Sequence, residues 1–193
     1  MSGPHSDALA TLRSWVAPTL EQEALRAAYV DHLESHPDGV YRDCRPDHLT
    51  ASTLVLSADT GEVLLTLHAK ARQWFQMGGH CEAGDHSLAG AALREAREES
   101  GLAELDLDPV PVQLSTHEVP FCGGAGADGG PVTRHLDVRF VAVAPPGATY
   151  AVSEESLDLR WFAADRLPTD DPEMAVLVGL AAGRVTNLTG QYP

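Results

Sequence analysis

The chain has 193 residues, of which 44% are hydrophobic, and its formal net charge at neutral pH is −15. This length fits one domain with an added terminal element and is long enough to bury an independent core. The acidic excess argues against an extended nucleic-acid-binding surface, which needs clusters of Lys and Arg. No apolar run is long enough to span a bilayer, so we expect neither nucleic acid nor a membrane among the partners.

The first residues lack the basic and apolar segments of a secretory signal. Cys44, Cys81 and Cys122 are odd in number and widely spaced, which argues against a disulfide framework or a zinc ribbon and for a reducing interior. Lys70 is the single lysine beside twelve arginines, a composition typical of GC-rich bacterial genomes. We therefore expect a cytoplasmic protein of bacterial origin.

Residues 6–35 show apolar residues mostly at three- and four-residue spacing, with a break near Pro18-Thr19, and this pattern predicts two helices. Thr19 followed by Gln22 resembles a capping box that opens the second helix. The turn 37–39 then marks a boundary. We interpret residues 1–40 as an N-terminal helical extension that packs on the domain or on a partner subunit. A homodimer is possible by this reading, with these helices as its interface.

The remaining residues, 41–193, alternate between strand and helix patterns. Residues 49–56 and 63–67 read as a hairpin around the turn 58–61. A short strand at 74–77 leads into a glycine loop, and Ser87 is a plausible cap for a helix over 87–100. The other predicted elements are strands at 112–119, 135–143 and 157–162, a glycine-rich loop at 122–130, and a closing helix at 172–184. Mixed strands around one prominent helix favour an α/β sandwich.

Glu95, Glu98 and Glu99 occupy positions i, i+3 and i+4 of the predicted helix, so their side chains fall within an arc of roughly 100°. Like charges at this spacing repel, and a hard divalent cation bound by oxygen ligands is the simplest compensation. The alternative is a solvated acidic face. The glycine loop 78–85 before the helix and the C-cap residue Gly101 after it favour a site.

The segment from Gly79 to Leu102 resembles the Nudix box. The matching residues are Gly79, Arg94, Glu95, Glu98, Glu99, Gly101 and Leu102. Asp85 stands where the family has its first Glu, eight residues instead of seven separate it from Arg94, and Ala96 replaces a larger aliphatic residue. The resemblance implies a Nudix-type α/β/α sandwich with a mixed sheet in residues 41–193, preceded by the helical extension.

The resemblance also implies a pyrophosphohydrolase that splits a diphosphate linkage in a nucleoside diphosphate joined to another moiety, with Mg²⁺ or Mn²⁺ as cofactor. Its implied metal ligands are the main-chain carbonyl of Gly78 and the carboxylates of Glu95, Glu98 and Glu99. Arg94 is expected to orient a glutamate, unless it forms only a surface i,i+4 pair. The general base stays open among Glu98, Glu118, Glu154 and Glu155.

Trp74 and Phe75, with Trp161 and Phe162, are candidates for stacking a nucleobase, although aromatic residues beside strands are more often core. His80 is a candidate for hydrogen bonding to substrate. A rival metal centre from His68, His80, His117 and His135 is disfavoured because these residues lie far apart in the sequence. A non-catalytic nucleotide-sensing module is the alternative function, but such modules commonly lose box carboxylates and none is lost here. Neither the substrate nor the number of metal ions follows from the sequence.

Overall fold

A computed structural model describes residues 3–119, 122, 132–152 and 156–189. Its elements, in chain order, are α1 (Pro4–Ser14), α2 (Leu20–Ser35), β1 (Asp47–Leu56), β2 (Glu62–His68), β3 (Trp74–Phe75), β4 (Met77–His80), α3 (Leu88–Ser100), β5 (Asp106–Glu118), β6 (Arg134–Val143), β7 (Ser156–Ala163) and α4 (Pro172–Thr189). None of the described helices combines the length and apolar character needed to cross a membrane.

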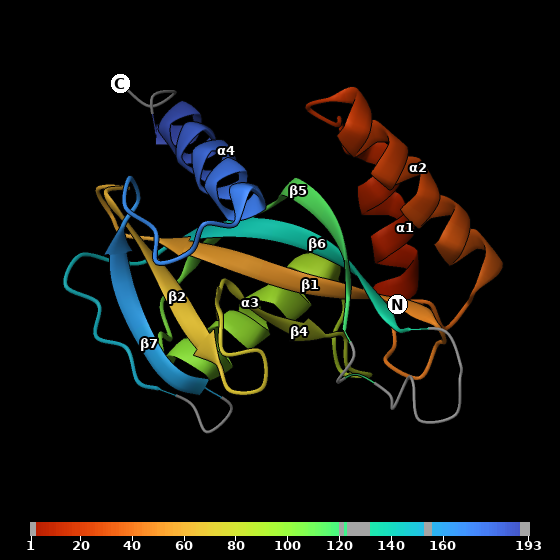
Figure 1. The fold of residues 1–193 in the computed structure, drawn as a ribbon. Coiled ribbons are helices and arrows are strands. Elements are labelled where there is room, and N and C mark those ends of the chain that lie inside the picture. The colour runs from red at the N-terminus through yellow and green to blue at the C-terminus, as the bar shows by residue number, and fades with distance from the viewer. Residues whose placement is uncertain (1–2, 120–121, 123–131, 153–155, 190–193) are drawn as a thin grey trace.

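The strands form one mixed sheet in the order β3-β2-β1-β6-β5, with β4 added to β1 and β7 added to β2. β1 and β6 pair in parallel along their whole length, from Asp47↔Arg134 to Leu56↔Val143, and the other pairs are antiparallel. α3 covers one face of the sheet and α4 the other, while α1 and α2 lie beside the β5 end (Figure 1). The predicted α/β/α sandwich with N-terminal helices is confirmed.

Side chains of β1 alternate between the two faces, as the pleat requires. Leu54 and Leu56 pack in a cluster with Leu177 of α4, whereas Val55 packs in another with Ala96 of α3. Toward the start of β1, the residues that face the α4 side of the sheet are polar instead of apolar. They are His48, Thr50 and Ser52, and all three are buried. This face therefore carries a polar strip beyond the apolar contact with α4.

Asp137 of β6 is the centre of that strip. Its carboxylate accepts hydrogen bonds from Thr50 (3.0 Å), Ser52 (2.7 Å) and Arg139 Nε (3.1 Å), and Arg139 also reaches Glu173 of α4 at 3.3 Å. Burial alone would raise the pKa of Asp137, but the Arg139 charge and the hydrogen-bond donors lower it. The carboxylate is fully compensated, so the strip is a rigid element of the fold.

The N-terminal helices cover the outer edge of β5. The Gln22 side chain accepts from the Leu114 N–H at 2.7 Å and donates to the Leu114 carbonyl at 2.9 Å, as a neighbouring strand would. Trp15 Nε1 donates to the Pro111 carbonyl (2.6 Å), and the Tyr29 hydroxyl donates to the Ser115 carbonyl (2.7 Å). These contacts protect an edge that could otherwise pair with another chain.

Several element predictions need correction in detail. Thr19 accepts the Gln22 N–H at 3.2 Å as predicted, but the Gln22 side chain contacts Leu114, so the capping box is only half formed.

β5 begins at Asp106, six residues before the prediction, because a register shift between Asp108 and Gln113 accommodates two prolines. α4 continues to Thr189. The loop at 122–130 lies outside the described residues, except for Cys122.

α1 also caps the N-terminus of α3. The Leu88 N–H donates to Asp7 Oδ2 at 2.8 Å, and the predicted cap Ser87 accepts the Gly90 N–H at 3.0 Å. A carboxylate at this end of a helix satisfies an unpaired donor and interacts favourably with the helix dipole. The extension therefore holds the start of the helix that carries the carboxylate cluster.

Replacing Asp7 by alanine leaves the Leu88 N–H without this acceptor. We expect the free energy of unfolding to fall by about 1 kcal/mol in urea denaturation. Asp31→Ala, at an exposed position of α2, is the matched control and should change stability by only a few tenths of a kcal/mol. Equal stability of the Asp7 variant and the parent protein would contradict the capping role.

Candidate active site

Two glycines let β4 approach its neighbours closely. A Cβ atom on Gly78 would lie 2.4 Å from Ser52 Cβ, and one on Gly79 would lie 2.5 Å from Glu95 Cδ. Neither position tolerates a side chain without displacing a neighbour. The glycine pair is therefore required by contact with β1 on one side and with α3 on the other.

The carboxylates of α3 face this glycine strand. Glu99 Oε1 accepts the Gly78 N–H at 2.8 Å, and the Glu95 side chain, 18% exposed, lies against Gly79. Glu98 is 59% exposed. Two of the three predicted carboxylates thus lie partly buried beside the glycine pair, and the third extends from the same helix face into solvent.

Arg94 binds several of these groups at once. Its Nη1 donates to Glu95 Oε1 and Glu98 Oε2, both at 3.0 Å, and its Nη2 donates to the His80 carbonyl at 3.0 Å. Nε and Nη2 also donate to the two oxygens of Asp85, at 3.1 and 3.0 Å. The hydrogen bonds to Asp85, followed by the neighbouring Glu95 charge, raise the pKa of Arg94. The i,i+4 contact with Glu98 is thus one part of a larger network.

Asp85 forms a bidentate pair with Arg94 although it replaces the expected Glu. It is 9% exposed and also accepts the Glu82 N–H at 2.8 Å. Burial would raise the pKa of Asp85, but the Arg94 hydrogen bonds and the Glu82 N–H outweigh it and lower the pKa. The helix is continuous from Leu88 to Ser100, so the extra residue before Arg94 does not interrupt it.

The donor set fits a hard divalent cation. The carboxylates of Glu95, Glu98 and Glu99 share one helix face and offer only oxygen, which Mg²⁺ and Mn²⁺ prefer. Arg94 neutralises part of their charge, and a cation would neutralise the rest. The Gly78 carbonyl remains a predicted fourth ligand.

A second group of metal-ligating side chains lies on β1, β4 and β6. His48, His80, His135 and Cys122 place one ligand atom each within 4.8 Å of all the others. His80 and His135 were candidates for a metal centre from the sequence, whereas His48 and Cys122 were not. His68 and His117 are not members: His68 Nδ1 accepts the Ala71 N–H, and His117 contacts the His135 ring.

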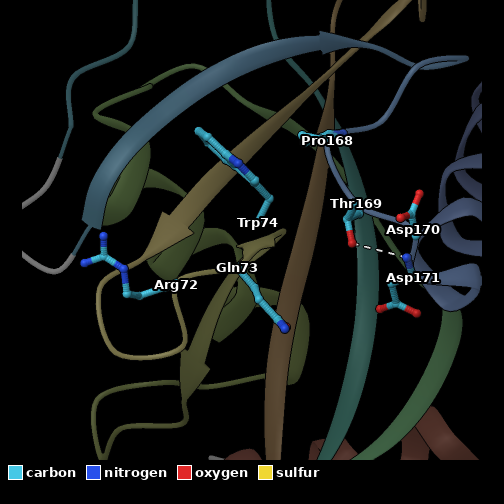
Figure 2. Close-up of a pocket in the computed structure, with 7 residues that line it drawn as sticks. All are labelled: Arg72, Gln73, Trp74, Pro168, Thr169, Asp170 and Asp171. Atoms are coloured by element: carbon cyan, nitrogen blue, oxygen red, sulfur yellow. Dashed lines mark hydrogen bonds between the residues drawn. The ribbon is translucent and has the colours of Figure 1, made fainter.

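Of the four predicted aromatic residues, Trp74 and Phe75 form β3, whereas Trp161 and Phe162 lie on β7. Trp74 packs edge-on against Phe162, with ring centroids 4.8 Å apart, and Phe75 contacts the His68 ring at 6.3 Å. Trp74 also lines a hollow of about 500 Å³ (Figure 2). Its other lining residues are Arg72, Gln73, Pro168, Thr169, Asp170 and Asp171. The hollow therefore combines one aromatic ring with side chains of both charges.

The other candidate general bases are Glu118, Glu154 and Glu155. Glu154 and Glu155 lie outside the described residues. Glu118 ends β5 opposite Arg134 and is exposed. Among the described residues, Glu98 is the candidate base that contacts the Arg94 network.

Comparisons with known proteins agree with this geometry. A family model described as NUDIX domain matches residues 46–178. Among solved structures, a NUDIX-family hydrolase from Clostridium perfringens is 23% identical, with a TM-score of 0.56, over 72% of this chain and 97% of that one. A C. elegans Ap4A hydrolase complex is 18% identical, with a TM-score of 0.55, over 72% and 98%. No curated protein matches the chain. The structural similarities, all at low identity, establish the fold.

Replacing Asp85 by asparagine removes the charged partner of Arg94, and we expect the free energy of unfolding to fall by about 1–2 kcal/mol at neutral pH. The folded-state pKa of Asp85 is lowered, so its contribution is present above the ordinary aspartate pKa and is lost as the pH falls through the folded value. The difference between variant and parent should therefore begin to shrink only below about pH 4, and it should vanish once the pH is below the folded-state pKa of Asp85.

Urea denaturation across this pH range is the measurement. Glu82→Gln is the control, because Glu82 belongs to the same loop but is 68% exposed and lies 3.9 Å from Arg94 Nη1. A loss as large for the Glu82 variant as for the Asp85 variant would refute the specific role of the bidentate pair.

Proposed function

Because this chain belongs to the Nudix family and is a Nudix hydrolase acting on pyrophosphate bonds, we propose that its substrate is a nucleoside diphosphate linked to another moiety and that hydrolysis requires a divalent cation. One observation carries the proposal: Glu95 and Glu99 are held against the glycine strand, on the same helix face as Glu98. Retention of all three carboxylates argues against a non-catalytic nucleotide-sensing module.

We assign Glu95, Glu98, Glu99 and the Gly78 carbonyl as cation ligands. A bound Mg²⁺ or Mn²⁺ would neutralise phosphate oxygens and lower the pKa of a bound water. The protein's part is orientation. Arg94 holds Glu95 and Glu98 through Nη1, and the Gly78 N–H holds Glu99. These contacts restrict the carboxylates before a substrate arrives, which lowers the cost of reaching the reactive arrangement.

Glu98 and Glu154 are our proposed general bases. The exposure of Glu98 supports the first choice, since a base must reach a water molecule beside the substrate, and its contact with Arg94 fixes its position. Glu154 precedes β7, a position similar to the acidic loop that supplies the base in some family members. Arg94 is proposed as a positioning residue for Glu95 and Glu98.

For substrate binding we propose Trp74, Phe75 and the main chain of His80. Trp74 and Phe75 form β3, which ends two residues before β4 begins, so one short segment carries both the aromatic rings and the glycine pair. This proximity along the chain supports base stacking near the diphosphate. The His80 carbonyl already contacts Arg94, which places this residue beside the network.

We also propose a cytoplasmic location. Cys44, Cys81 and Cys122 are all free and buried, the state expected of thiols in a reducing compartment.

A homodimer through the N-terminal helices is a further part of the proposal. Val16 and Leu20, in and beside the link between α1 and α2, are 87% and 90% exposed, and burying them against a second copy would remove apolar surface from water. We expect light scattering to give the mass of two chains, and the double variant Val16→Ser, Leu20→Ser to shift it toward one. Val176→Ser, 54% exposed on α4, should leave the mass unchanged. A single-chain mass for the parent protein would refute the dimer.

Replacing Glu99 by glutamine keeps an oxygen acceptor for the Gly78 N–H but removes the charge that binds a cation. We expect turnover to fall by about two orders of magnitude or more, with little change in the unfolding transition. Hydrolysis should be scored by product identity on sugar nucleotides, nucleoside triphosphates, dinucleoside polyphosphates and NADH. Glu104→Gln, at an exposed position after α3, is the control.

Removing divalent cations with a chelator should abolish hydrolysis, and adding Mg²⁺ or Mn²⁺ should restore it. Unchanged turnover in the Glu99 variant, or full activity in excess chelator, would overturn the proposed function.

A further inference from the structure

We propose that His48, His80, His135 and Cys122 form a zinc site that is separate from the carboxylate face of α3. Three of the ligand atoms have the spacing of one coordination shell, and the fourth, from His135, lies within 4.8 Å of each of them. Nε2 of His80 and Nε2 of His48 are 3.1 Å apart, and Cys122 Sγ lies 3.6 Å from the first and 3.8 Å from the second. A tetrahedral Zn²⁺ with ordinary bond lengths separates two nitrogens by about 3.3 Å and a nitrogen from a sulfur by about 3.6 Å.

The ring nitrogens are arranged as metal ligands. His48 Nδ1 lies 3.1 Å from the Cys44 carbonyl, which can only accept, so Nδ1 carries the proton and Nε2 presents a lone pair to the cluster. His135 Nε2 is buried and has no hydrogen-bond partner among the described residues. A buried ring nitrogen without a partner is costly, and a cation at the centre would satisfy it.

Protonation does not offer the same compensation. Burial lowers the pKa of His80 to about 4 and that of His135 to about 3, and it also lowers the pKa of His48. A proton between His48 Nε2 and His80 Nε2 would provide one hydrogen bond, whereas a cation would bind all four ligand atoms of the group.

Strand register brings these residues together and separates them from the box. His48 lies directly opposite His135 in the β1–β6 pair, and His80 lies opposite Thr50, two residues farther along β1. Gly79 faces Glu95, so the next residue, His80, points to the opposite face of the sheet. The nitrogen and sulfur donors thus lie across the sheet from the carboxylates.

The composition of the group identifies the ion class and its role. Imidazole and thiolate ligands select Zn²⁺ over Mg²⁺ or Mn²⁺, and four protein ligands leave no open position for substrate. The site would therefore be structural, linking β1, β4 and β6 to Cys122. Because the His80 carbonyl accepts from Arg94 at 3.0 Å, the ion would also fix one end of the box network.

Zinc content is the first measurement. The full chain, purified without chelator and without immobilised metal, should contain about one Zn²⁺ per molecule by elemental analysis, and the ion should raise the unfolding temperature. Exchange with Co²⁺ should give a thiolate-to-cobalt charge-transfer band and intense tetrahedral d–d bands. Less than about one tenth of an equivalent, even after loading with excess Zn²⁺, would overturn the proposal.

Variants locate the ion. Cys122→Ser and His135→Ala should each lower zinc content at least tenfold, and the cysteine variant should lose the charge-transfer band. Cys81→Ser is the matched control: it too replaces a buried thiol, one whose pKa burial raises to about 12, and it should retain zinc. His117→Ala should also retain it, because His117 contacts His135 without belonging to the ligand group. Zinc retained by Cys122→Ser together with its charge-transfer band would refute the assignment.

A third variant distinguishes this site from the catalytic one. Replacing Glu95, Glu98 and Glu99 together by glutamine should leave zinc content and the cobalt spectrum unchanged, whatever happens to hydrolysis. Loss of zinc from this triple variant would instead place the ion at the carboxylates of α3 and would refute the proposal of a separate site. If the chain did not hydrolyse any of the nucleotides tested, the zinc content of the parent protein would still be expected at about one ion per molecule.

Discussion

The close contact between β4 and α3 is the constraint on which the candidate active site depends. Gly79 has no side chain toward α3 and Gly78 has none toward β1, so β4 lies close to both elements. That contact lets a main-chain N–H bind Glu99 and brings Glu95 under the strand. A methyl group on Gly79 would displace the Glu95 carboxylate, and one on Gly78 would press on Ser52 and separate β4 from β1.

The contact also creates a charge problem, which Arg94 partly solves. Its guanidinium donates to two glutamates, to both oxygens of Asp85 and to a main-chain carbonyl. Lysine could not do this, because its three donors diverge from one nitrogen, whereas the planar guanidinium offers five in fixed directions. One positive charge still faces Asp85, Glu95, Glu98 and Glu99 in a chain whose net charge is −15. The remaining negative charge would attract a divalent cation to this face, as proposed above.

Local patterns in the sequence were sufficient to predict the helices, most strands and the carboxylate face, since each depends on residues within a few turns of one another. The start of β5 was missed because its prolines mask the strand pattern, and only the bulge opposite β6 accommodates them. The role of Gln22 depends on an edge strand 92 residues away. The His/Cys group was missed for the same reason: no spacing in the chain relates His48 to His135, and only the parallel register of β1 and β6 makes them neighbours.

Gly79 and His80, consecutive residues of β4, face opposite sides of the sheet, and the metal-ligating groups on the two sides differ in chemistry. Beside Gly79 lie carboxylate oxygens, which suit a hard cation that exchanges readily and can be shared with phosphate oxygens. At His80 lie imidazole nitrogens and a thiol, which suit a softer ion held in a closed shell. Because ligand type discriminates between these ions, zinc at the second face need not compete with magnesium at the first. A tightly held ion behind β4 would restrict the movement of the strand against which the catalytic carboxylates are oriented, and so contribute to hydrolysis without contacting the substrate.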